Sequence, residues 1–88
     1  MKIISAQQIA GLAISPVECL QWIEYCFRIK YNSVLPPKIS IHAPGEVFFN
    51  TMPCYLPAPE SFFGAKLVSR FPNRTPALQS EILLYDAT

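Results

Sequence analysis

Charged residues are scarce in this sequence. They make up 15% of its 88 residues, whereas an average globular domain has about 25%. Seven Lys and Arg stand against six Asp and Glu, which leaves a formal net charge of +1 at pH 7. A balance this small produces no field that would attract nucleic acid or an acidic partner. We therefore expect no nucleic-acid partner.

Long apolar runs are missing as well. No stretch approaches the ~18 consecutive apolar residues of a membrane-spanning helix. Gln7 and Gln8 interrupt the segment that follows Lys2, so the amino terminus does not have the apolar core of a signal peptide. We expect a cytoplasmic protein with no membrane partner.

The cysteines fit neither a disulfide framework nor a metal site. Cys19, Cys26 and Cys54 are an odd number of thiols without a close pair. Cys19 and Cys26 both fall on a predicted helix, where their spacing separates them by about 10 Å along the axis, beyond disulfide reach. The expected role of the thiols is that of small core residues, with no bound metal.

Glycine is rare, and its positions exclude a nucleotide-binding loop in this chain. Gly11, Gly45 and Gly64 are too far apart for the G-x-G-x-x-G pattern that cradles a dinucleotide pyrophosphate. We expect no cofactor in this chain. We also expect no catalytic residues, because no Ser, Cys or His has the spacing of a nucleophile and its base.

Apolar residues, by contrast, are abundant. They make up 51% of the chain, and aromatic residues make up 12%. A chain of this length buries only roughly 60–65% of the surface that its unfolded form exposes, so its core is thin. So much apolar surface with so little charge is unfavourable in a small monomer.

The clearest local signal is the start of a helix. Ser15-Pro16-Val17-Glu18 combines an N-cap serine, a proline at the first helical position and a glutamate three residues after the cap. Beyond it, apolar residues recur at spacings of three and four and define one helical face, widened by Cys19, Trp22 and Cys26: Val17, Leu20, Ile23, Phe27 and Tyr31. Asn32 and Ser33 end this helix. Ser5 caps a shorter predicted helix over residues 6–11.

After Pro37 the apolar period changes to two, which predicts strands. We expect strands at Lys38–His42, Glu46–Met52, Phe62–Arg70 and Gln79–Tyr85, with a hairpin turn at Ala43-Pro44-Gly45 and loops at Pro53–Glu60 and Phe71–Leu78. Met1–Ile4 is expected to be a short strand or an extended lead-in. The predicted class is α+β: one long capped helix and a short helix packed on a mainly antiparallel sheet of about four to five strands.

Lys66 is the first candidate for a binding role. It is the only charge in the apolar segment Phe62–Val68. Alternation places it on the same strand face as Phe62, Gly64 and Val68. If that face is buried, the ammonium needs a negative partner, and a carboxylate ligand would supply it. Otherwise Lys66 is an edge lysine whose head group reaches water.

Lys38 is the second candidate, and it begins the first predicted strand directly after two prolines. It joins Lys66 at one end of the sheet, or it is a solvated residue at the end of a strand. The two lysines decide between binding and a purely structural role. A shared, partly buried concave site favours a ligand, whereas a Lys66 that faces bulk solvent favours a scaffold.

Several segments, in this order and spacing, resemble the ornithine cyclodeaminase / mu-crystallin family. They are Pro36-Pro37-Lys38, Phe49-Asn50-Thr51-Met52-Pro53, Phe63-Gly64-Ala65-Lys66-Leu67-Val68-Ser69, Phe71-Pro72-Asn73, Pro76-Ala77-Leu78-Gln79 and Leu83-Leu84-Tyr85-Asp86. The resemblance covers nearly the whole chain. It implies that residues 1–88 form a single domain, the amino-terminal substrate-binding and dimerisation part of such a protein. The resemblance further implies a homodimer or a higher homo-oligomer formed through the β-sheet, in which a second subunit completes the sheet.

The resemblance also implies a parent activity and a set of site residues. Family members are NAD(P)-dependent enzymes that oxidise amino acids or reduce imines, and some release ammonia and cyclise the product. Lys66 and Lys38 match the residues that hold the substrate carboxylate, and Met52 and Asn50 match residues that line the substrate pocket. The family usually has arginine where this chain has Lys38. Asn50 is neutral where ornithine-specific members have an acidic residue, which disfavours ornithine as the substrate.

The sequence thus predicts a truncated or fragmentary substrate-binding domain that lacks the Rossmann domain of its relatives. On its own it is expected to be inactive, with a small amino or imino acid as its ligand. The alternative is a standalone, non-catalytic dimeric scaffold derived from the same family.

Overall fold

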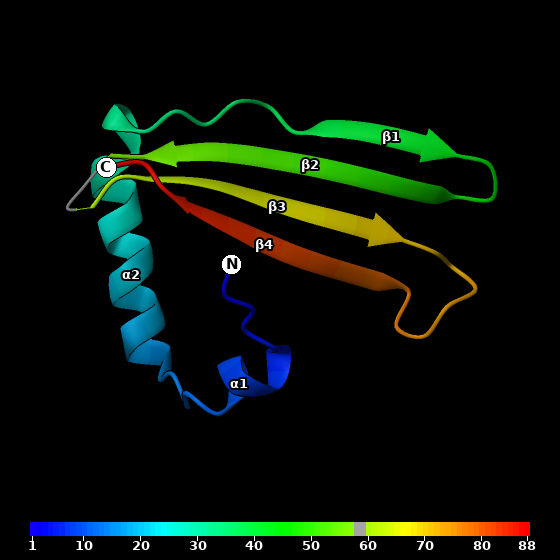
Figure 1. Ribbon diagram of the computed structural model, residues 1–88, viewed down its shortest axis with the longest axis horizontal. Helices are drawn as coiled ribbons and strands as arrows, with labels where there is room; N and C mark the ends of the chain where they lie inside the picture. The colour runs from blue at the N-terminus through cyan, green and yellow to red at the C-terminus, as the bar shows by residue number, and fades with distance from the viewer. Residues whose placement is uncertain (58–59) are drawn as a thin grey trace.

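The computed structural model describes residues 1–57 and 60–88, and this part of the chain has an α+β architecture (Figure 1). Two helices come first, and α2 continues into the 3-10 turn η1: α1 (Ala6–Ala10), α2 (Pro16–Ile29) and η1 (Lys30–Asn32). Four strands follow: β1 (Ile39–Ala43), β2 (Val47–Leu56), β3 (Phe62–Arg70) and β4 (Leu78–Asp86). They form one antiparallel sheet in the order β1-β2-β3-β4. The predicted α+β class is confirmed.

Both helices begin at reciprocal serine caps. The Ser15 hydroxyl accepts a hydrogen bond from the Glu18 backbone N–H (3.2 Å), and the Ser15 N–H donates to the Glu18 carboxylate (3.3 Å). Ser5 and Gln8 form the same pair at α1. Each box satisfies N–H groups that have no partner within the first helical turn. The expected capping boxes and the expected end of α1 at Gly11 are confirmed, whereas Met1–Ile4 is an extended lead-in.

The sheet differs from the expectation chiefly in β2. This strand was expected to end at Met52 and to be followed by a loop over Pro53–Glu60, but it continues to Leu56. The Tyr55 N–H donates to Val34 on the β1 side of β2 (2.9 Å), and backbone N–H groups two residues apart point the same way. The missing N–H of Pro53 therefore falls on that side, beyond the end of β1, where no ladder bond is lost. Ala58 and Pro59, within the expected loop, lie outside the described residues.

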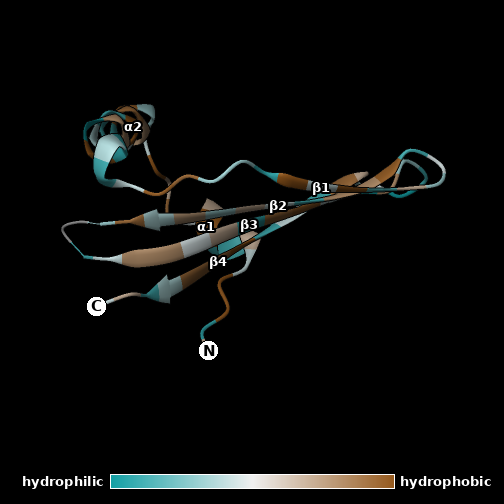
Figure 2. Cartoon of the chain, turned by 90° about the horizontal axis from the view of Figure 1, so that it is seen from above, coloured by the Kyte–Doolittle hydropathy of each residue, from teal (hydrophilic) through white to brown (hydrophobic). Residues whose placement is uncertain are grey.

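The helical part contacts the sheet at one end. Val34 and Tyr55 exchange two backbone hydrogen bonds of 3.0 and 2.9 Å, which anchor the segment after η1 to β2. Seen along the sheet, α2 lies near this end and to one side of the strands (Figure 2). Its apolar side chains remain exposed, among them Leu20, Trp22 and Phe27.

Neither face of the sheet is covered within a single chain. None of the described residues is buried. The accessible surface is 7478 Å², whereas a folded monomer of this size exposes about 5,200 Å². The radius of gyration is 15.3 Å, against about 12 Å for a compact chain of this length.

The thiols consequently do not occupy a core. Cys19 and Cys26 are exposed and Cys54 is half-buried, and all three are unpaired. The expectation of core cysteines is therefore wrong for the chain by itself. The physical reason is that α2, which carries two of them, does not pack its apolar face against the sheet.

Candidate functional site

The strand register divides the sheet into two faces with a simple rule. Every pairing joins residues of equal parity, as in Ile39 with Thr51, Phe48 with Arg70 and Phe62 with Asp86. Directly paired residues project to the same side of a sheet, and neighbours along a strand project to opposite sides. All even-numbered strand residues therefore share one side, the even face. All odd-numbered ones share the other, the odd face.

The register brings the predicted binding residues together on the even face. Met52 pairs directly with Lys66, and Lys66 pairs with Ile82. Ile39 pairs with Thr51, so extending this register by one residue places Lys38 opposite Met52. Met52, Lys66 and Ile82 form one row across β2, β3 and β4. The first strand was expected to begin at Lys38 but begins at Ile39, so Lys38 lies one residue before β1 and joins the row only by this extension. We call the four residues the lysine row.

The spacing of the lysine row suits one small anion. Adjacent strands are about 4.8 Å apart, which places the backbones of Lys38 and Lys66 about 10 Å from each other. Lysine carries a compact point charge on a flexible four-carbon stem, so both ammonium groups can reach a ligand lying over Met52. Two such charges would hold a carboxylate without the bidentate geometry of an arginine.

Asn50 adds an unused hydrogen-bond acceptor next to the row. It lies on the even face two residues before Met52, and it pairs with Val68 and Ser40. Its side-chain Oδ1 is shielded from solvent and has no hydrogen-bond partner among the described residues. Leaving a shielded acceptor unsatisfied costs about 1–3 kcal/mol. A ligand N–H group placed there would remove this cost.

Gly64 and Cys54 occupy the other side of the row. They form the next even-face pair after Met52 and Lys66. A Cβ on Gly64 would approach the Cys54 Sγ to 3.1 Å, so glycine leaves room for the thiol at this position.

Neither lysine has a counter-ion among the residues that the structure describes. Both are exposed, and no carboxylate of the described residues forms an ion pair with either of them. The ion pair that the structure does show, Arg28–Glu24 at 3.9 Å, lies on α2. The shelter that the sequence analysis required for Lys66 is therefore not provided by this chain alone.

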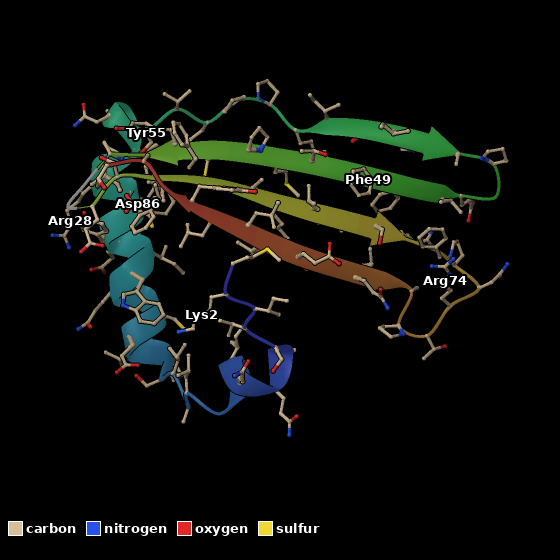
Figure 3. The ribbon with its side chains drawn as sticks, viewed as in Figure 1. Lys2, Arg28, Phe49, Tyr55, Arg74 and Asp86 are labelled. Atoms are coloured by element: carbon tan, nitrogen blue, oxygen red, sulfur yellow. The ribbon has the colours of Figure 1, made fainter. Side chains whose placement is uncertain are left out.

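On the even face of β4, Asp86 is the acidic residue nearest to the lysine row, but its carboxylate is hydrogen-bonded to Thr88. It lies four residues beyond Ile82, about 13 Å along the strand from the lysine row. Its carboxylate accepts hydrogen bonds from the Thr88 hydroxyl (2.5 Å) and the Thr88 N–H (2.8 Å). These two bonds lower the pKa of Asp86, the hydroxyl more than the N–H. Asp86 and Arg74 mark the two opposite ends of the sheet in Figure 3.

Two hollows lie away from the lysine row. One of about 300 Å³ is lined by apolar and thiol side chains of α2, with Lys30 and Leu35 at its edge. The other, of about 180 Å³, lies between the β1–β2 turn and the β3–β4 loop. There the Arg74 guanidinium stacks 3.7 Å above the Phe71 ring, a contact that sequence spacing alone did not indicate.

No group of three or more His, Cys, Asp or Glu residues in the described ranges 1–57 and 60–88 could hold a metal ion. Within the same ranges, no helix is both long enough and apolar enough to cross a membrane.

Comparison with known proteins found no matching family model, no matching curated protein and no matching solved structure. The resemblance to the ornithine cyclodeaminase / mu-crystallin family therefore stays a prediction from the sequence. What the structure defines is an open, four-stranded antiparallel sheet with a lysine row on one face.

Proposed function

We propose that this chain is a substrate-binding domain for a small amino or imino acid. It would serve an NAD(P)-dependent amino-acid or imine oxidoreductase, or an ammonia-releasing cyclodeaminase, in the cytoplasm. The observation that carries the proposal is the lysine row. Met52 and Lys66, far apart in the sequence, are directly paired, and extending the β1–β2 register by one residue brings Lys38 into line with them. The pairing supports the proposal independently of the resemblance, from which Met52 was predicted.

Each residue of the site would have a defined task. Lys66 and Lys38 would hold the α-carboxylate between two positive charges. The free Oδ1 of Asn50 would accept a hydrogen bond from the amino or imino N–H. Met52, between the two lysines, would supply an adaptable apolar wall. Hydride transfer would be the task of a nicotinamide held outside this chain, and no residue here is assigned to it.

Calorimetric titration of the chain tests this proposal. L-Alanine, L-proline and L-ornithine serve as probes, and L-alaninamide serves as the matched control because it has the amine without the carboxylate. We expect binding of the acids, no preference for ornithine, and no binding of the amide. Lys66→Met should abolish binding, whereas Lys2→Met, which removes an exposed lysine outside the sheet, should leave it unchanged. Equal heats for alanine and alaninamide would contradict the proposal.

A second candidate is a dimeric scaffold that binds no small ligand. It is favoured by the exposure of Lys66 and Lys38 and by their lack of a counter-ion. In β3, Lys66 and Phe63 are exposed and the other residues are half-buried, so the exposure of Lys66 supports this candidate, whereas its alignment with Met52 supports the ligand. The same titrations separate the candidates, because a dimer that responds to none of the acids would be a scaffold.

A further inference from the structure

The hollow between the β1–β2 turn and the β3–β4 loop has mainly apolar walls. Its volume is about 180 Å³, and its apolar lining residues come from both connections: Pro44, Val47, Phe71 and Pro72. Its polar side chains are those of Asn73 and Arg74. An apolar protein cavity of about 150 Å³ takes up benzene. This hollow therefore has room for a compact apolar group of that size.

Hydrogen bonds hold the walls of the hollow in place. The Arg70 guanidinium donates to the Glu46 carbonyl oxygen (3.0 Å), which ties the end of β3 to the β1–β2 turn. Within the β3–β4 loop, the Phe71 N–H donates to the carbonyl of Ala77 and the Arg74 N–H donates to that of Phe71, both at 2.9 Å. The hollow is therefore formed before a ligand arrives, which lowers the entropic cost of binding.

Arg74 brings a positioned guanidinium with unused donors to this hollow. The guanidinium lies 3.7 Å above the Phe71 ring, and stacking of this kind occupies the flat face of the group rather than the N–H bonds in its plane. Among residues 1–57 and 60–88, no acceptor takes a hydrogen bond from the guanidinium and no carboxylate pairs with it. Figure 3 labels Arg74 beside the β3–β4 loop, at the end of the sheet away from Asp86. A planar fork of donors is thus held at the hollow without a partner.

The charges around the hollow suit an anion with a single negative charge. Among the residues that line it, Arg74 is the one charged side chain. The neighbouring Arg70 already donates to the Glu46 carbonyl oxygen, and the carboxylate of Glu46 belongs to the same turn, so it repels a doubly charged phosphate more strongly than a carboxylate. A guanidinium binds a carboxylate through two parallel hydrogen bonds. A carboxylate is therefore the anion that best matches this site.

We propose that this hollow is a second binding site, separate from the lysine row, for a carboxylate that carries a compact apolar group. Arg74 binds the carboxylate, and the apolar group lies against Val47 and the two prolines. Arg70, the last residue of β3, is four residues beyond Lys66, about 13 Å along the strand. The two sites are therefore too far apart to share one small ligand, and this inference does not depend on the proposed function.

An NMR titration with benzoate tests the site, and benzamide is the matched neutral control. With the arginine side chains labelled by ¹⁵N, the Nε–H group of each arginine is observed separately. We expect a saturable shift at Arg74 with benzoate and none with benzamide, while Arg28, on α2, stays unchanged. Equal shifts with the two compounds, equal shifts at the two arginines, or no saturable shift at Arg74 would overturn the proposal. Tighter binding of inorganic phosphate than of benzoate would overturn the choice of a carboxylate.

Substitutions, followed by calorimetric titration with benzoate, separate the guanidinium fork from charge alone. Arg74→Gln should weaken binding at least about tenfold, and Arg74→Lys, which keeps the charge without the fork, at least about threefold. Arg28→Gln is the control and should bind like the wild type. Arg74 is exposed and lies in a loop, so its variants should keep the circular dichroism of the wild type. Unchanged affinity in either Arg74 variant would overturn the proposal.

The same variants distinguish this site from the proposed substrate site. Arg74→Gln should bind L-alanine like the wild type, and Lys66→Met should bind benzoate like the wild type. Loss of benzoate binding in Lys66→Met would place the carboxylate at the lysine row and overturn the second site. A failure of either site is thus read from a different variant and a different probe.

Discussion

At the scale of single residues, the even face has groups whose bonding capacity is unused in the chain. Lys66 and Lys38 lack a carboxylate partner among the described residues, and the Asn50 Oδ1 lacks a donor. Unused charge and an unused acceptor on one face are what a bound zwitterion would satisfy, because it carries a carboxylate and an ammonium group together. This is why we propose an amino or imino acid, and not a simple anion, as the ligand.

Asn50 provides a test that separates stability from binding. Asn50→Leu removes the unpaired acceptor and places a well-packing side chain at the same point of the strand, so it should stabilise the unliganded protein by about 1 kcal/mol. The same change should weaken L-alanine binding, since the N–H group loses its acceptor. Urea denaturation and calorimetric titration measure the two effects. Loss of stability, or unchanged affinity, would contradict the assignment.

Asp86 provides a test by titration. The bonds from Thr88 hold the pKa of Asp86 below its ordinary value, so the folded state binds this proton more weakly than the unfolded state does. The Asp86–Thr88 turn therefore contributes stability at pH values above the unfolded pKa, and the contribution disappears as the pH falls through the lowered folded pKa. Thr88→Ala should raise the pKa of Asp86 towards its ordinary value in an NMR titration of the carboxyl carbons. Glu60 would serve as an internal reference, and an unchanged Asp86 would refute the assigned cause.

At the scale of elements, local chemistry fixes the helices. The Ser15 box is built from residues three apart, so it could be read directly from the sequence. Ser15→Ala should cost about 1 kcal/mol of stability, measured as the free energy of unfolding in urea and accompanied by lower helicity. Ser80→Ala, on the exposed strand β4, is the control and should change stability by less than about half as much. Equal effects would show that the cap does not stabilise α2.

The strands show which features of the fold could be predicted from the sequence and which could not. β3 was predicted with its observed bounds, because its mainly apolar run carries Lys66 as the only charge before Arg70 and is flanked by predicted loops. β2 was predicted too short, since Pro53 looked like a strand terminator. The strand tolerates Pro53 because β1 does not extend alongside this residue and because Val34 pairs with Tyr55 farther along β2. Neither fact can be read from the residues next to Pro53. Lys66 was predicted as a binding residue from its place in an apolar strand, and Met52 from a resemblance, but their direct pairing follows only from the register.

At the scale of the whole molecule, the single chain exposes more surface than a compact monomer of its length. The sheet is regular and paired throughout its interior, yet both faces and the apolar side of α2 remain open to solvent. Composition indicated this outcome, because a chain with 51% apolar and 15% charged residues cannot cover its surface with polar groups. Composition could not indicate which residues share a face of the sheet. That distinction depends on the equal parity of the strand pairs.

The most direct measurement of the central claim is an NMR titration that observes all four lysines of the protein at once. With the lysine side chains labelled by ¹³C, L-alanine is added to the assembled wild-type protein, and L-alaninamide is added to a second sample. The account predicts saturable shifts at Lys38 and Lys66 with alanine alone, while Lys2 and Lys30, which lie outside the sheet, stay unchanged. Shifts that are equal at all four lysines, or absent at Lys66, would contradict it.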